Sequence, residues 1–302
     1  PLSEVLAASR LHPPTIKQVE KRLSNVVLNT SDEMDPDLLV FFDRRTLSEL
    51  HGWREYFRGR KAQRAFDPVD QWIQMVASNR LTGHSKGFFS VYTLPPNQAA
   101  SIAAQRRINE KRKQVPEYRD TKALIHRKTK RLLRHRLPKS YRRKDFRIFS
   151  SSADHTESIP SNSVDLVVTS PPFLDTVDYV GDNWLRMWFC EVRLNPDTIW
   201  QLKSLEDWVR RMRSVFGELN RVLKPGGFVA FEVGEIRNGV LQLENEAVKA
   251  GSEAGLIPEC IMINAQDFTK TANCWGVSNN EKGTNSNRIA VFRKGDGPLA
   301  LR

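Results

Sequence analysis

The stretch VDLVVTSPPF, from Val164 to Phe173, joins an apolar run to a rigid exit. The run is rich in β-branched residues, which predicts a short strand buried on both faces of a parallel sheet. Pro171 and Pro172 lack backbone donors and disfavour helix before them, so the strand ends at Thr169 in a stiff, extended turn. Ligands of open α/β sheets bind at the carboxyl ends of the strands. The sequence therefore predicts a site at Ser170, Pro171, Pro172 and Phe173.

The chain around this stretch divides into a helical part and a part in which strands and helices alternate after Lys144, as in an α/β domain. The upstream helices are predicted at residues 1–10, 15–27, 38–57, 69–78, 101–114 and 121–137, with a loop leading into a strand at 83–92. Further strands are predicted at residues 146–150, 228–233, 259–265 and 288–293, and helices at 184–190, 204–223 and 242–254. Lys224-Pro225-Gly226-Gly227 predicts a turn before the strand that begins at Phe228.

The positive charge of the chain lies in one segment. The formal net charge is +12, and residues 106–147 hold 18 Lys and Arg against 4 Asp and Glu, a local balance of +14. Such a segment repels itself unless a polyanion lies alongside, which favours contact with a phosphate backbone over a merely solvated pair of helices. The predicted contact residues are Arg106, Arg107, Lys111, Arg112, Arg127, Lys128, Lys130, Arg131 and Arg134.

The cysteines and the hydropathy exclude several classes of protein. Cys190, Cys260 and Cys274 show no paired spacing, so neither a disulfide framework nor a metal site is indicated. No apolar run approaches the roughly 20 residues of a membrane span, and no signal peptide is visible. We expect a soluble, cytoplasmic protein with no membrane partner.

Two segments together carry a family resemblance. NSVDLVVTSPPF (Asn162 to Phe173) and LNRVLKPGGFVAFEVG (Leu219 to Gly234) resemble the S-adenosylmethionine-dependent DNA methyltransferases that modify exocyclic amines. The resemblance implies a Rossmann-like class I methyltransferase sheet, incomplete at its N-terminus, with a basic, mainly helical insertion. It divides the chain into a core helix (1–14), a DNA-contacting and target-recognition region (15–144) and the catalytic core (145–302).

The resemblance also implies the chemistry. The serine form of the tetrapeptide is associated mainly with cytosine N4, and the aspartate form mainly with adenine N6. Hydrogen bonds from the amine to Ser170 and to a proline-flanked carbonyl would aim its lone pair at the methyl group, and Phe173 would stack on a base flipped out of double-stranded DNA. A cognate restriction endonuclease is the protein partner that such an enzyme could have. Methylation at cytosine C5 needs a Pro-Cys nucleophile, and no cysteine here follows a proline.

The cofactor, S-adenosylmethionine, is implied by the resemblance, which assigns Asp154, Thr169 and Ser170 to its site. For Asp154 a helix-capping role is an equal alternative. The family's FxGxG loop is absent. Pro1-Leu2 resembles the family's sequence after its second strand, so the loop is expected upstream, whereas a circularly permuted alternative would use Phe231-Glu232-Val233-Gly234.

Several features of the sequence fit more than one role. Trp184, Trp188 and Phe189 fit either a base pocket or a core. Residues 270–287, rich in Asn, Thr, Gly and Lys, fit either a nucleic-acid contact or a plain surface loop. The chain as a whole could also be a non-catalytic nucleic-acid-binding protein, or could methylate RNA or a protein glutamine.

Overall fold

The computed structural model describes residues 2–29, 35–94, 99–135, 146–172, 174, 178–193, 199–234, 241–265 and 286–295. The chain forms two compact units. The helical unit comprises residues 1–150 and 179–199, and the sheet unit comprises residues 151–178 and 200–302. Phe173 and most of residues 270–287 lie outside the described residues. Among the described helices, none has the length and apolar character of a membrane span.

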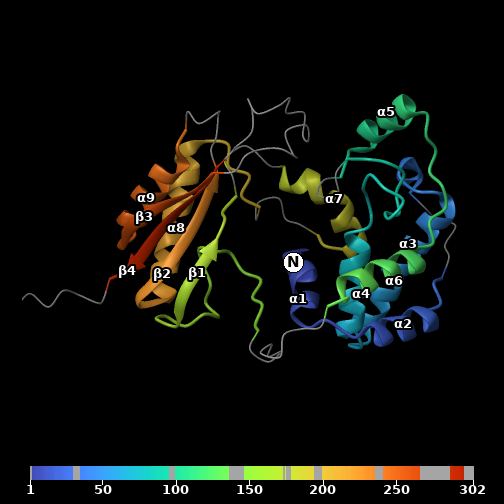
Figure 1. The fold of residues 1–302 in the computed structure, drawn as a ribbon, viewed down its shortest axis with the longest axis horizontal. Coiled ribbons are helices and arrows are strands. Elements are labelled where there is room, and N and C mark those ends of the chain that lie inside the picture. The colour runs from blue at the N-terminus through green and yellow to red at the C-terminus, as the bar shows by residue number, and fades with distance from the viewer. Residues whose placement is uncertain are drawn as a thin grey trace, which may run out of the picture. The chain divides into compact units, whose positions relative to one another are not determined.

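The helical unit contains seven described α-helices and a short 3₁₀ helix (Figure 1). They are α1 (Leu2–Leu11), α2 (Ile16–Asn25), η1 (Pro36–Val40), α3 (Arg44–Ala62), α4 (Pro68–Ser78), α5 (Ile102–Arg112), α6 (Thr121–Leu132) and α7 (Tyr179–Cys190). Side chains of Thr15, Asp43, Asp67, Ser101 and Asp120 cap the helices that follow them. The predicted helix over residues 38–57 is divided, because Asp43 caps a new helix at Arg44.

The core of the helical unit is aromatic. Trp53, Phe57 and Phe189 are buried within it, and the Trp53 and Phe57 rings stack with centroids 5.5 Å apart. Trp184 and Trp188 pack against the same cluster. Trp184, Trp188 and Phe189 are therefore core residues, which decides between the two roles that the sequence left open for them.

Helix α6 is fixed by hydrogen bonds to its buried side. Trp53 Nε1 donates to Thr121 Oγ1 at 3.0 Å, and Trp72 Nε1 donates to Thr129 Oγ1 at 3.0 Å. Glu49 accepts bonds from the Thr121 amide and hydroxyl. Because both threonines face the core, the opposite side of α6 is turned outward.

The sheet unit is an α/β structure, as the sequence predicts. Its described strands are β1 (Val164–Thr169), β2 (Leu223–Gly234), β3 (Leu256–Ala265) and β4 (Ser286–Lys294), in the order β1-β2-β4-β3. β1 and β2 are parallel, whereas β4 runs antiparallel to both of its neighbours. Between the pairs Val164–Leu223 and Leu166–Phe228 the register shifts, where the predicted turn places Gly226 at φ 75°.

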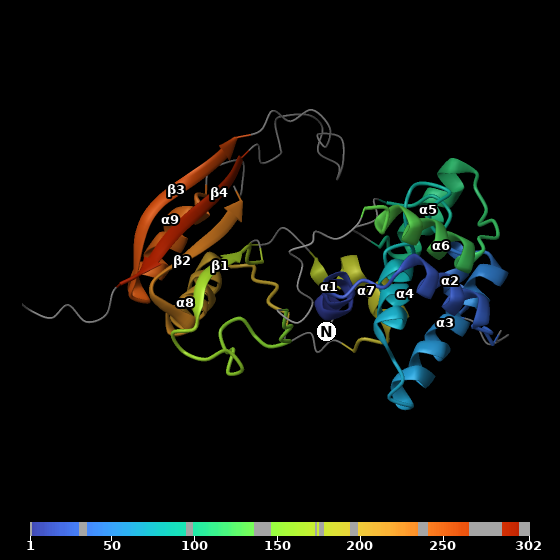
Figure 2. The same cartoon turned by 60° about the horizontal axis from the view of Figure 1, so that its bottom comes forward.

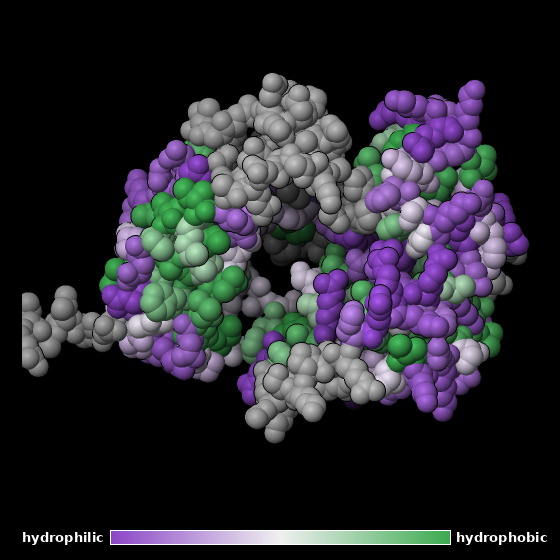
Figure 3. All heavy atoms as spheres, viewed as in Figure 1, coloured by the Kyte–Doolittle hydropathy of each residue, from purple (hydrophilic) through white to green (hydrophobic). Residues whose placement is uncertain are grey.

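Helices α8 (Leu205–Val222) and α9 (Leu243–Glu253) cover one face of the sheet (Figures 1 and 2). Phe216 is the centre of that layer, with its ring centroid 4.6 Å from Phe231 and 5.0 Å from Phe292. Apolar side chains on the other face are exposed, including Val168 at 75% and Leu166 at 58%. Figure 3 shows this apolar patch on the sheet unit.

Three predictions about strands are wrong or need correction. β1 is not buried on both faces, since no described element covers Leu166 and Val168. Residues 146–150 form no strand and have no partner strand among the described residues. Phe149 in this segment is 45% exposed. Residues 83–92 form no strand either, and their one described ladder contact is an isolated bridge between Gly83 and Tyr92.

The two units divide the chain differently from the predicted ranges. α1 packs on α4, and α7 packs on α1, α3 and α4, so both lie within the helical unit. The functional roles assigned to residues 1–14, 15–144 and 145–302 stay predictions.

Candidate catalytic turn and nucleic-acid interface

The loop before β1 is fixed to the end of α8. The Arg221 guanidinium donates to the carbonyl oxygens of Thr156 and Ile159 at 3.1 and 2.9 Å. Glu218 accepts from the Thr156 amide at 2.7 Å and pairs with Arg221. The bond from Arg221, with help from Thr156, lowers the pKa of Glu218 to about 2. The start of β1 is therefore held in register.

The turn after β1 is fixed from the other end of α8. Trp208, fully buried, donates its indole N–H to the carbonyl of Pro172 at 3.0 Å. Leu174 is 1% exposed and belongs to the sheet core. Because β1 holds one side of the turn and Trp208 the other, Ser170 lies on a short, rigid piece of backbone.

The polar groups of this turn point to a hydrogen-bonding site. The Ser170 side chain is exposed, and no described residue hydrogen-bonds to it or to the Pro171 carbonyl. A hydroxyl and a neighbouring carbonyl of this kind can accept two hydrogen bonds from one NH₂ group. The predicted Ser170, Pro171 and Pro172 are thus brought together, and Phe173 lies outside the described residues.

Asp154 lies beside α8. Its carboxylate hydrogen-bonds to the Ser152 hydroxyl and is 3.8 Å from the Arg211 guanidinium, which lies over the Trp200 ring. No described helix begins at Asp154, so the structure gives it no capping role.

The described residues fit only part of an S-adenosylmethionine site. Thr169 and Ser170 offer hydroxyls at the carboxyl end of β1, where a methyl donor could meet an amine. Asp154 could accept a bond from the cofactor only by sharing a carboxylate that Ser152 and Arg211 already engage.

The nine predicted DNA-contacting residues fall on two separate helices. Arg106, Arg107, Lys111 and Arg112 belong to α5, where Arg106 pairs with Asp37 at 2.6 Å and Arg112 lies 3.7 Å from the Tyr92 ring centroid. Arg127, Lys128, Lys130, Arg131 and Arg134 belong to α6 or directly follow it.

On α6 the cations form a stripe. Arg127, Lys130, Arg131 and Arg134 follow one another at spacings that place them on one side of a helix, and all four are exposed. Figure 3 shows hydrophilic side chains over α4 and α6. None of the four forms an ion pair with a described carboxylate.

Two cations from elsewhere in the helical unit, Arg10 and Arg80, act on the charged residues of α6. Burial lowers the pKa of Lys128, and so do the charges of Arg80, Arg131 and Arg10. Burial, with the charge of Arg131, lowers the pKa of Arg80 to about 10. We call Arg10, Arg80, Lys128 and Arg131 the four-cation cluster. Within the described ranges none of them has a carboxylate partner. Nothing in the sequence points directly to Arg10 and Arg80, because they are distant from α6 along the chain.

Comparison with known proteins finds a family match over β1 and the chain that follows it. Residues 164–296 match the model of the N6/N4 DNA methylase family. The matched segment runs through β1, the proline turn, α7, α8, β2, α9, β3 and β4, so it includes one helix of the helical unit. The N6/N4 methylase match therefore covers the candidate catalytic turn and excludes the four-cation cluster.

Two solved structures are similar to part of this chain. PvuII DNA methyltransferase (cytosine-N4-specific) is 19% identical, with a TM-score of 0.30, over 47% of this chain and 46% of that one. A candidate DNA modification methylase of Thermus thermophilus, complexed with S-adenosyl-L-methionine, is 22% identical, with a TM-score of 0.31, over 48% of this chain and 54% of that one. This chain thus spans about half the length of these proteins. No curated protein matches it.

Proposed function

We propose that the protein is an S-adenosylmethionine-dependent DNA methyltransferase that methylates an exocyclic amine, with cytosine N4 as the favoured target. The observation that carries this proposal is the Ser170-Pro171-Pro172 turn at the carboxyl end of β1, inside the segment that matches the DNA methylases. The serine in the tetrapeptide is what favours cytosine N4 over adenine N6.

In this proposal the turn positions the amine. The Ser170 hydroxyl and the Pro171 carbonyl each accept a hydrogen bond from the NH₂ group, which turns the nitrogen lone pair away from the ring. Trp208 acts as a positioning residue, because its indole nitrogen holds the Pro172 carbonyl at 3.0 Å. S-adenosylmethionine, when bound, supplies the methyl group. Positioning of this kind accounts for a large part of an enzymatic rate.

The helical unit supplies the contact with DNA in the same proposal. The α6 stripe and the four-cation cluster present positive charge from α1, α6 and the residues after α4. Duplex DNA carries closely spaced phosphates, and releasing their counterions gives affinity that does not depend on sequence. We therefore assign the backbone contact to this surface of the helical unit.

A methylation assay tests the proposal. Full-length protein is incubated with DNA and labelled S-adenosylmethionine, and the nucleosides are separated. We expect label in N4-methylcytosine and a loss of at least about 100-fold in rate for Ser170→Ala, the size seen when one preorganised hydrogen-bonding group is removed. Ser252→Ala, on the exposed side of α9, is the matched control and should behave like wild type.

Three further outcomes of this assay distinguish the competing functions. Label in N6-methyladenine would correct the target base while keeping the turn as the site. If the full-length protein binds DNA but transfers no label, the protein is a non-catalytic DNA-binding protein. Equal rates for Ser170→Ala and wild type would remove the turn from the mechanism.

A further inference from the structure

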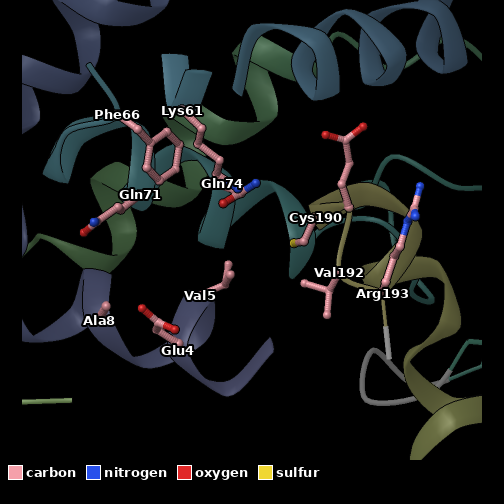
Figure 4. A pocket seen from close by; sticks show the side chains of 11 residues that line it. Glu4, Val5, Ala8, Lys61, Phe66, Gln71, Gln74, Cys190, Val192 and Arg193 are labelled. Carbon is pink, nitrogen blue, oxygen red and sulfur yellow. The ribbon is translucent and has the colours of Figure 1, made fainter. Parts of the chain in front are cut away.

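A pocket in the helical unit lies outside the segment that matches the methylases, apart from Cys190 and the three residues that follow it. It has a volume of about 460 Å³, within the range of small-molecule sites. Its wall is formed by α1, by the end of α3, by α4 with Phe66 before it, and by the end of α7 with the residues that follow it. Figure 4 shows side chains from all four places around the same space.

Gln74 is the unusual residue of this pocket. It is 2% exposed, yet none of the described residues hydrogen-bonds to its side-chain amide. In Figure 4 the amide lies between Lys61 and Cys190. On the pocket wall this amide is free to hydrogen-bond to a ligand, and it offers both a donor and an acceptor.

The charges of the pocket favour an anion. Lys61 and Arg193 have no ion-pair partner among the described residues, whereas Glu191 is already paired with Arg58 and Arg54. Glu4 is the remaining carboxylate on the wall. Two cations against one remaining anion leave a positive balance, and the Lys61 ammonium, 4.9 Å from the Phe66 ring centroid, lies beside an aromatic side chain.

Cys190 adds no covalent chemistry. Burial raises the pKa of its thiol to about 12, so the side chain stays a neutral part of the wall. The pocket therefore has no activated nucleophile at this position.

We propose that this pocket binds a nucleotide. The phosphate lies toward Lys61, and the edge of the base exchanges hydrogen bonds with Gln74, as a carboxamide does with the donor and acceptor on one base edge. The nucleotide is either free in solution or an unstacked nucleotide of bound DNA. Only the second source depends on the DNA contact proposed above.

The test measures binding to the full-length protein by calorimetry. The probes are deoxynucleoside monophosphates, a single-stranded oligonucleotide and inorganic phosphate. Gln74→Leu and Lys61→Ala should each weaken nucleotide binding at least tenfold, and Lys249→Ala, on α9 of the sheet unit, should not change it. Gln74→Leu should change the melting temperature little, because no described residue loses a hydrogen-bond partner.

The outcomes are distinct from those of the methylation assay. Binding of free monophosphates assigns the pocket to a free nucleotide, and binding of the oligonucleotide alone, weakened by Gln74→Leu, assigns it to DNA. Inorganic phosphate that binds as tightly as the nucleotides would overturn the role of the base and of Gln74. Wild-type affinity in both variants, or no binding of any probe, would overturn the site.

Discussion

The helical unit and the sheet unit bury their apolar side chains in different ways. In the helical unit the helices surround an aromatic core, and the outward face of α6 is charged. In the sheet unit a single layer, α8 and α9, covers one face, and Val168 and Leu166 stay exposed on the other. The two units therefore present different features: the helical unit carries positive charge on the outer surface of a fully covered core, and the sheet unit holds a rigid turn at the end of a strand.

The largest effect should come from removing the charge of the helical unit. Changing Arg127, Lys130, Arg131 and Arg134 to Gln together should lower DNA affinity by orders of magnitude and reduce the slope of log affinity against log salt by about 3 to 4, since each phosphate contact contributes about 0.9. Filter binding at several salt concentrations measures both quantities.

The control for this prediction removes charge from the sheet unit. Lys203→Gln with Lys249→Gln should leave the salt slope unchanged. An unchanged slope for the four-residue α6 variant would show that the stripe is only a solvated face of the helix.

A smaller effect is expected from the pH dependence of the sheet unit. The pKa of Glu218 is lowered from 4.5 to about 2 in the folded protein. Its contribution to the free energy of unfolding is therefore present above about pH 4.5 and is lost as the pH falls toward 2. The side chain is 8% exposed, and after solvent screening the shift corresponds to about 2 to 3 kcal/mol. Glu218→Gln should lose this stability at pH 7, as measured by urea denaturation.

The matched control is Glu206→Gln on the same helix, which should change the free energy of unfolding little. If wild type and Glu218→Gln lose stability in parallel between pH 4.5 and 2, the contact with Thr156 and Arg221 does not hold the loop before β1.

The smallest effect comes from a pair of valines on neighbouring strands. Val229 is fully buried under α8 and α9, whereas Val168 is 75% exposed on the open face. Val229→Thr buries a hydroxyl and should cost about 1 to 3 kcal/mol. Val168→Thr should stay within about 0.5 kcal/mol of wild type. Equal costs in chemical denaturation would mean that the second face of the sheet is covered too.

The sequence predicted the strands and the turn well where chemistry is local. Pro171 and Pro172 end β1 as expected, and the Lys224 to Gly227 turn lies within β2, where the register with β1 shifts. The apolar run of β1 could not show that one face is open, because side-chain type does not report how many layers cover a strand. Residues 146–150 look equally strand-like in sequence, yet they have no partner strand among the described residues.

The candidate sites depend more on distant contacts. No sequence pattern links Trp208 to Pro172, or Arg10 and Arg80 to α6, since each contact joins segments far apart along the chain. Gln74 resembles an ordinary polar residue of a helix in the sequence, and only its burial without a described partner marks the pocket.

The place of β1 in the sheet has a consequence for amide hydrogen exchange. β2 is its one neighbour among the described strands, whereas β2 lies between β1 and β4. Because successive amides of a strand point to opposite sides, alternate amides from Val164 to Thr169 should exchange quickly and the others slowly. Those of β2 from Phe228 to Phe231, which have a partner strand on both sides, should all exchange slowly. The strand that leads to Ser170 would then carry an alternating pattern of protection up to the residue where the turn begins.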